Sequence, residues 1–182
     1  DVSLATVEKL AVMQEELNPW LEHRGAGASW NDASSMRIGL ISLDDLDDVM
    51  LMSVSDAVTR VTDSLVPFKV SLRGLKCLPE DNPRIILAEV AMGRELVEGL
   101  RKVVSVHLEK LGVAPDDRPA IPSVFVGRLS GTTRQPVAAD LGAYEFGDSQ
   151  VRSIVLLRQE LTPRGATTEV LRRFALGPAP AS

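Results

Sequence analysis

Residues 122–129 read PSVFVGRL, and this run predicts a strand around Ser123–Leu129 that is introduced by a proline. A second β-like run, SMRIGLISL, covers residues 35–43 in the first quarter of the chain. Successive side chains of a strand point to opposite faces, so residues two apart in each run share one face. These two runs therefore fix which side chains can meet in a common site.

Amphipathic helices are predicted where apolar residues recur at spacings of three and four. They cover residues 4–21, 44–65 and 96–111. Ser3 is a suitable N-cap for the first helix, and Pro19 is expected to bend or end that helix near Asn18. Gly112 is expected to close the third helix.

Apolar and alternating runs predict four further strands. They lie at residues 68–72, 85–89, 151–161 and 167–176. A short turn of helix is expected to begin at Pro136. This mixed order of helices and strands favours an α+β fold with an antiparallel-rich sheet. Because 182 residues suffice for one core, we predict a single domain over residues 1–176, followed by a flexible tail at 177–182.

Composition excludes several classes of protein. With 45% hydrophobic and 25% charged residues, the chain matches an ordinary globular protein, and no apolar run reaches the roughly 20 residues that span a bilayer. The net charge of −5 disfavours long-range attraction to a nucleic acid duplex. The single cysteine, Cys77, and the absence of a signal-peptide pattern favour a reducing compartment, the cytoplasm first and an organelle as the alternative.

Few residues of this chain can carry out acid–base or metal chemistry. The two histidines are His23 and His107, and His107 flanks the apolar stripe of its predicted helix, where a hydrogen-bonded structural role fits best. The four aspartates between residues 44 and 48 fit the start of a helix better than a metal site. The motifs typical of nucleotide, zinc and serine-nucleophile sites are missing from the sequence. We therefore expect neither a metal nor a cofactor.

Several strings, in their order along the chain, resemble the two-histidine phosphoesterases, the superfamily of 2′-5′ RNA ligase-like proteins and RNA 2′,3′-cyclic phosphodiesterases. The strings are residues 29–43, 68–75, 83–87, 116–129, 151–156 and 169–174. The resemblance implies two pseudo-symmetric lobes, with outer helices, around a central cleft that the runs at 35–43 and 122–129 line. The strand that usually opens this family is not found before the first helix. The resemblance therefore implies an uncovered sheet edge, which a partner, another copy or a rearrangement would cover.

In that family, each of the two cleft strands carries the pattern H-x-T-x. Here Arg37 and Gly39 stand at the first histidine and threonine positions, and Ser123 and Phe125 stand at the second pair. Arginine stays protonated and cannot act as a base, and serine without a partner is a poor acid or base. The resemblance therefore implies degenerate motifs and no catalytic residue.

Two interpretations of the cleft remain open at the level of sequence. Arg37, Ser123, Phe125 and Arg128 could bind a phosphate or an RNA base. Alternatively, Phe125 fills the cleft and Arg37 pairs with an aspartate that follows its strand. Three functions correspond to these interpretations. The first is an interaction or scaffold protein, for example in RNA processing, with a protein partner or a homo-oligomer. The second is a non-catalytic module for RNA ends or nucleotide phosphates, and the third is an active phosphodiesterase.

Overall fold

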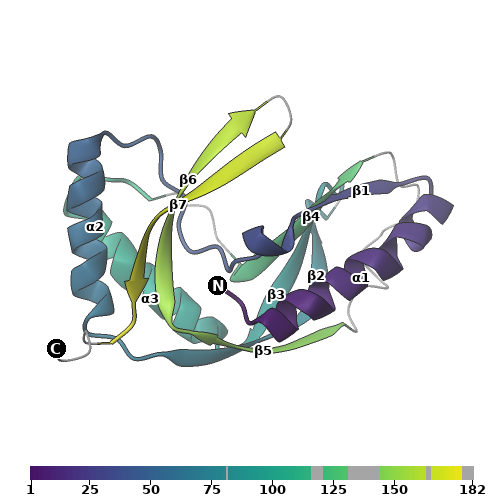
Figure 1. Cartoon of the computed structure of the whole chain (residues 1–182), viewed down its shortest axis with the longest axis horizontal. Helices are drawn as coiled ribbons and strands as arrows, with labels where there is room; N and C mark the ends of the chain where they lie inside the picture. Colours follow the sequence, from purple (N-terminus) through teal and green to yellow (C-terminus); the bar gives the residue numbers. More distant parts are fainter. Residues whose placement is uncertain (81, 116–120, 131–143, 163–164, 178–182) are drawn as a thin grey trace.

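Three α-helices and seven strands form the described part of the chain, which comprises residues 1–80, 82–115, 121–130, 144–162 and 165–177 of the computed structural model (Figure 1). The helices are α1 (Leu4–His23), α2 (Asp48–Thr62) and α3 (Arg94–Glu109), and a short 3-10 helix, η1, spans Ala33–Ser35. The strands are β1 (Gly27–Trp30), β2 (Phe68–Leu78), β3 (Ile85–Met92), β4 (Ser123–Ser130), β5 (Glu145–Val151), β6 (Ser153–Thr162) and β7 (Gly165–Ala175). None of the helices in these residues is long and apolar enough to cross a membrane.

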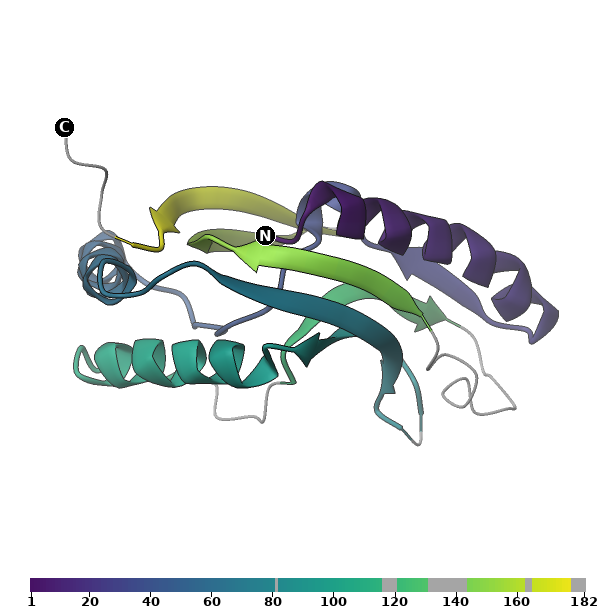
Figure 2. The same ribbon diagram turned by 90° about the horizontal axis from the view of Figure 1, so that it is seen from below.

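The first lobe is a five-stranded antiparallel sheet with α1 on one face (Figure 2). Its strands follow the order β1-β4-β3-β2-β5, so β4 lies between β1 and β3. The apolar stripe of α1 packs on the sheet and forms the larger core. Its members include Leu10, Met13, Leu17 and Leu21 of the helix and Val70, Val90, Val124 and Val126 of the strands. This burial is the main force that holds the helix on the sheet.

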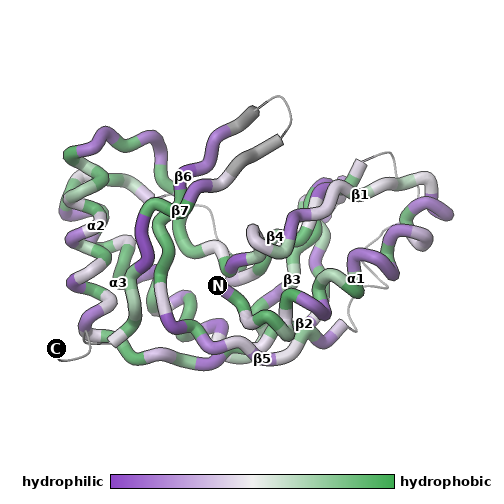
Figure 3. Tube along the Cα trace, viewed as in Figure 1, coloured by the Kyte–Doolittle hydropathy of each residue, from purple (hydrophilic) through white to green (hydrophobic). Residues whose placement is uncertain are grey.

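The second lobe contains the β6–β7 hairpin, α2 and α3. Hydrophobic and hydrophilic residues alternate along α2, as they do in a helix that is buried on one side (Figure 3). A second core joins the two helices to the hairpin. Its members include Val54, Val58, Val61, Leu100, Val104, Leu108 and Phe174. The chain is thus an α+β protein with two lobes, as the sequence predicts.

The three helices of the sequence analysis are confirmed, although their ends differ. Ser3 caps α1, because its Oγ accepts the N–H of Thr6 at 3.2 Å. The expected end near Asn18 is wrong, since α1 continues through Pro19 to His23. The burial of Leu21 in the core stabilises this last turn and outweighs the backbone hydrogen bond that proline cannot make. Gly112 has a φ of +78°, the conformation expected where a helix ends.

The strand predicted at residues 35–43 is wrong. This segment forms only one isolated bridge, Ile38 with Val124, and its other residues pair with no strand in the described part of the chain. The sequence analysis also missed β1 and most of β5. The remaining predicted strands are confirmed. The expectations for residues 116–119, Pro136 and the tail after Gly177 lie outside the described residues.

Candidate functional site

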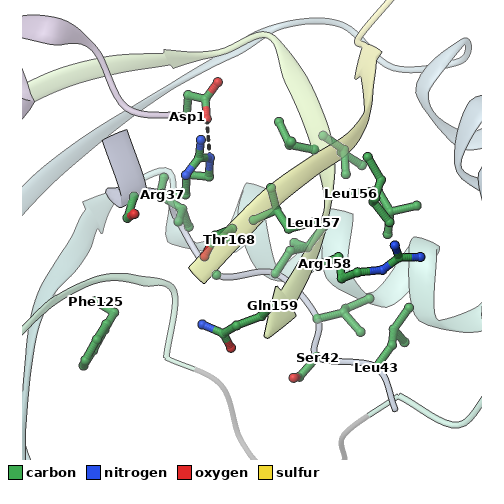
Figure 4. A pocket seen from close by; sticks show the side chains of 18 of the residues that line it. Asp1, Arg37, Ser42, Leu43, Phe125, Leu156, Leu157, Arg158, Gln159 and Thr168 are labelled. Atoms are coloured by element: carbon green, nitrogen blue, oxygen red, sulfur yellow. Dashed lines mark ion pairs between the residues drawn. The ribbon is translucent and has the colours of Figure 1, made fainter. Parts of the chain in front are cut away.

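A cavity of about 900 Å³ lies between the two lobes (Figure 4). Residues 37–46 line one of its walls and residues 153–159 of β6 line another. Trp30 of β1 and both Phe125 and Arg128 of β4 line the side that belongs to the first lobe. The residues that the sequence analysis places in the cleft can therefore be compared directly with this cavity.

Arg37 lines the cavity, but its guanidinium is held at one end of it. Its Nε lies 2.9 Å from Oδ1 of Asp1, and the same carboxylate contacts Arg173. The Nε atom is buried and its N–H is not aligned for a hydrogen bond, so the contact with Asp1 is an ion pair. The expectation that Arg37 pairs with an aspartate after its own segment is therefore wrong in the partner, which comes from the start of the chain.

Phe125 and Arg128 form a second feature of the cavity. The guanidinium carbon of Arg128 lies 5.5 Å from the centre of the Phe125 ring, within the range of a cation–π contact. Asn31 donates a hydrogen bond of 3.0 Å to the carbonyl oxygen of Phe125 and so fixes the backbone at this position. An aromatic face and a guanidinium therefore stand together at the side of the cavity, where a planar or anionic ligand could reach them.

Ser123 is not brought into the cavity. Its side chain is buried, and its hydroxyl donates a hydrogen bond of 2.9 Å to the carbonyl oxygen of Ile121. Gly39, in contrast, lines the cavity, and no atom lies within 4 Å of the position that a Cβ would take there. The structure thus brings Arg37, Gly39, Phe125 and Arg128 to one cavity and leaves Ser123 beneath its surface.

Neither histidine lines the cavity. His23 is exposed at the last turn of α1. His107 lies on α3, where its Nδ1 is 2.9 Å from the carbonyl oxygen of Val103, and this hydrogen bond agrees with the structural role expected for it. Asp47 caps α2, and the described residues contain no cluster of histidine, cysteine and carboxylate side chains that could hold a metal ion.

The cavity also contains residues that the sequence analysis did not place there, namely the β6 wall at residues 153–159, Asp1 and Trp30. Asp1 escaped because no sequence pattern links it to Arg37, 36 positions away. Trp30 lies on the missed strand β1, and its indole N–H donates to Asn18 Oδ1 at 2.7 Å. Gly27–Trp30 reads Gly-Ala-Ser-Trp, which has no alternation of polar and apolar residues, so the sequence holds no signal that could have revealed this strand.

The comparisons with known proteins agree on one superfamily, although no family model matches the chain. The RNA 2′,3′-cyclic phosphodiesterase of Aquifex aeolicus is 26% identical over 153 residues, which are 81% of this chain and 81% of the relative. The protein of the same name from Archaeoglobus fulgidus is 27% identical over 169 residues, 89% of this chain and 93% of the relative. The crystal structure of Escherichia coli LigT in its apo form has a TM-score of 0.77 at 14% identity, covering 97% of this chain and 94% of LigT.

A bilobal α+β fold with an antiparallel sheet, and a cavity between the lobes, define the structural class. In fold and in sequence, the chain is similar to the two-histidine phosphoesterase superfamily, the 2′-5′ RNA ligase-like proteins.

Proposed function

We propose that this chain is a catalytically degenerate two-histidine phosphoesterase that acts as an interaction component and does not hydrolyse phosphodiesters. One observation carries the proposal: the cavity between the lobes is lined by no imidazole. The resemblance to the family assigns its two histidine positions to Arg37 and Ser123. Both positions lack a group that exchanges protons near neutral pH.

The family's reaction needs a base for the nucleophile and an acid for the leaving oxygen. The guanidinium of Arg37 keeps its proton throughout the accessible range of pH. The hydroxyl of Ser123 donates to Ile121 and has no base beside it among the described residues. Each proton-transfer group contributes about two to four decades of rate, so replacing both removes most of the catalysis.

Exposed apolar side chains support a role in protein interaction. Along α3 and the residues just before it, Met92, Leu96, Val103 and Val106 are all exposed, and Val49 and Met52 are exposed on α2. Where such side chains form a contiguous patch, they mark interaction sites. A place within an RNA-processing assembly would suit the superfamily.

A second candidate function is the binding of nucleotide phosphates without hydrolysis. The pair of Phe125 and Arg128 favours it, because an aromatic face can stack on a base and a guanidinium can contact a phosphate. The structural neighbour E. coli LigT has been crystallised in complex with 3′-AMP. In this chain, the fluorescence of Trp30, which lines the same cavity, would report such binding.

The proposal is tested by incubating the purified chain with 2′,3′-cyclic AMP and separating the products by chromatography. We expect no more 2′-AMP or 3′-AMP than a parallel purification from cells without the protein releases. Fluorescence in the same samples separates the two candidates, since a saturable change that Phe125→Ala abolishes supports nucleotide binding. Product that rises in proportion to the protein, and survives the parallel control, would overturn the degenerate-enzyme proposal.

A further inference from the structure

The outer edge of β6 has no neighbouring strand. β6 pairs with β7 along its whole length, and no other strand of the described residues pairs with it. In an antiparallel pair, every second residue directs its N–H and C=O groups away from the partner strand. On β6 these groups face the cavity, because every residue from Ser153 to Gln159 lines it. Such an edge is a template for another strand.

The opposite wall of the cavity also has backbone N–H groups without a backbone partner among the described residues. Residues 37–46 line it, and among their backbone N–H groups only that of Gly39 donates to another described backbone group, Ser123 O at 3.1 Å. The two walls also run in the same direction, from Arg37 and Asp1 at one end to Leu43 and Gln159 at the other (Figure 4). A strand added to β6 and antiparallel to it would therefore also run antiparallel to residues 37–46.

Both walls carry several apolar side chains that are only half-buried. On one wall they are Ile38, Leu40, Ile41 and Leu43, and on β6 they are Ile154, Val155, Leu156 and Leu157. By comparison, a strand with neighbours on both sides is well buried in this protein. β4 lies between β1 and β3, and its Val124 and Val126 are fully buried. Burying the half-exposed aliphatic groups under one more strand is favourable.

The groove between residues 37–46 and β6 carries charges of opposite sign at its two ends. At the Arg37 end, Arg37 and Arg173 already hold one carboxylate, that of Asp1, and Arg173 also donates to the hydroxyl of Ser153 at the start of β6. At the other end, Asp44 and Asp45 are exposed. A strand antiparallel to both walls has its carboxyl end near Arg37 and its amino end near Asp44. The groove is therefore complementary to a segment with acidic residues at its carboxyl end and basic residues at its amino end.

We propose that this groove binds an extended segment of a partner protein, which adds to β6 as a third strand with its carboxyl end at Arg37. The segment carries alternating apolar side chains, basic residues at its amino end and acidic residues at its carboxyl end. This inference rests on the proposed function, because it names the kind of partner that an interaction component would hold.

The test uses a synthetic peptide with capped ends, Lys-Lys-Val-Thr-Val-Thr-Val-Glu-Glu, added to the isotope-labelled full chain. Two control peptides keep the length: one exchanges the lysines with the glutamates, and the other replaces the valines with serine. We expect saturable shifts in the amide resonances of residues 37–46 and β6, and slower hydrogen exchange at alternate amides of β6. Both control peptides should bind at least tenfold more weakly.

Variants of the protein make the result specific. Leu157→Lys on β6 and Ile41→Lys on the facing wall should each weaken binding at least tenfold, and Val12→Lys on the exposed face of α1 should leave it unchanged. Circular dichroism confirms that each variant is folded. No binding of the first peptide at 1 mM, equal binding of all three peptides, or a dimer of the free chain that covers β6 would overturn the inference. Because none of these results involves cyclic phosphates, they are independent of the hydrolysis assay.

Discussion

At the scale of single residues, the cavity presents side chains that can contact an anion or an aromatic ring. At one end Arg37 and Arg173 contact the carboxylate of Asp1, and on the side of the first lobe the guanidinium carbon of Arg128 lies 5.5 Å from the centre of the Phe125 ring. All of these groups can attract or shield a ligand. A guanidinium keeps its proton and a phenyl ring has none to exchange, and this separates binding from catalysis in our proposal.

Gly127 is a residue whose size the fold restricts. A Cβ at this position would lie 2.7 Å from Trp30 Cε3 and 2.8 Å from the carbonyl oxygen of Ser29, which is closer than atoms in folded proteins approach. We expect Gly127→Ala to lower the free energy of unfolding by about 1–3 kcal/mol, because β1 must move away from β4. Gly39→Ala is the matched control, since no atom lies within 4 Å there. Urea denaturation of both variants checks this, and equal stabilities would contradict it.

Cys77 provides a prediction about pH. Burial raises the pKa of its thiol to about 11, from 9.0, and its side chain is only 1% exposed. Between these two values the unfolded chain loses the proton while the folded chain keeps it, so stability falls as the pH rises. Relative to Cys77→Ala, the unmodified chain should lose about 1 kcal/mol between pH 8 and pH 10. Urea denaturation at both values of pH measures this difference, and a constant difference would show that the thiol is not protected.

At the scale of elements, we distinguish the aspartate that caps α2, Asp47, from the other aspartates that precede the helix. Asp47 Oδ1 accepts the N–H of Met50 at 2.7 Å and so satisfies one free donor of the first turn. Asp47→Ala should destabilise the protein by about 1 kcal/mol, which is roughly 2–4 °C in Tm. Asp45→Ala, at an exposed position before the helix, should change stability by less than about 0.5 kcal/mol. A thermal melt in which both variants lose the same stability would contradict the capping role.

The helices and strands that have a clear hydrophobic pattern in their own residues could be predicted from the sequence. The helices have strong apolar periodicity, and β2, β3, β4 and the β6–β7 hairpin have alternating or apolar runs between turn residues. The segment at residues 35–43 has the same local signal, yet a strand also needs a neighbour. In the described part of the chain only Val124 pairs with it. The pattern of residues 35–43 by itself could not show that this segment has so few strand partners among the described residues.

The candidate site could likewise be predicted only in part. The resemblance places Arg37, Gly39, Phe125 and Arg128 at the cleft, and the structure brings them to one cavity. The direction of a side chain could not be predicted in the same way. Ser123 is turned toward Ile121, and Arg37 is held by Asp1, which lies far away in the sequence. Both outcomes depend on tertiary neighbours that no periodicity encodes.

At the scale of the whole molecule, the two lobes are unequal. One has a five-stranded sheet and the other a two-stranded one, and the cavity lies between β6 and the segment that faces it. Leu40, Phe68 and Ile154 contact both cores, so they connect the lobes across this region. The fold of the superfamily is thus present, and the positions on which our proposal of a degenerate enzyme depends, among them Arg37, Gly39 and Phe125, line the cavity.

The most direct test of that claim is to rebuild both motifs and measure the hydrolysis of 2′,3′-cyclic AMP. The variants are the double change Arg37→His with Ser123→His, and the fourfold change that adds Gly39→Thr and Phe125→Thr. We expect the unmodified chain and the double variant to stay at the level of a mock purification, because both still lack the two threonines of the family pattern. The fourfold variant should exceed that level by about two decades. A fourfold variant that is folded and still as slow as the mock purification would contradict the claim that these side chains alone prevent hydrolysis.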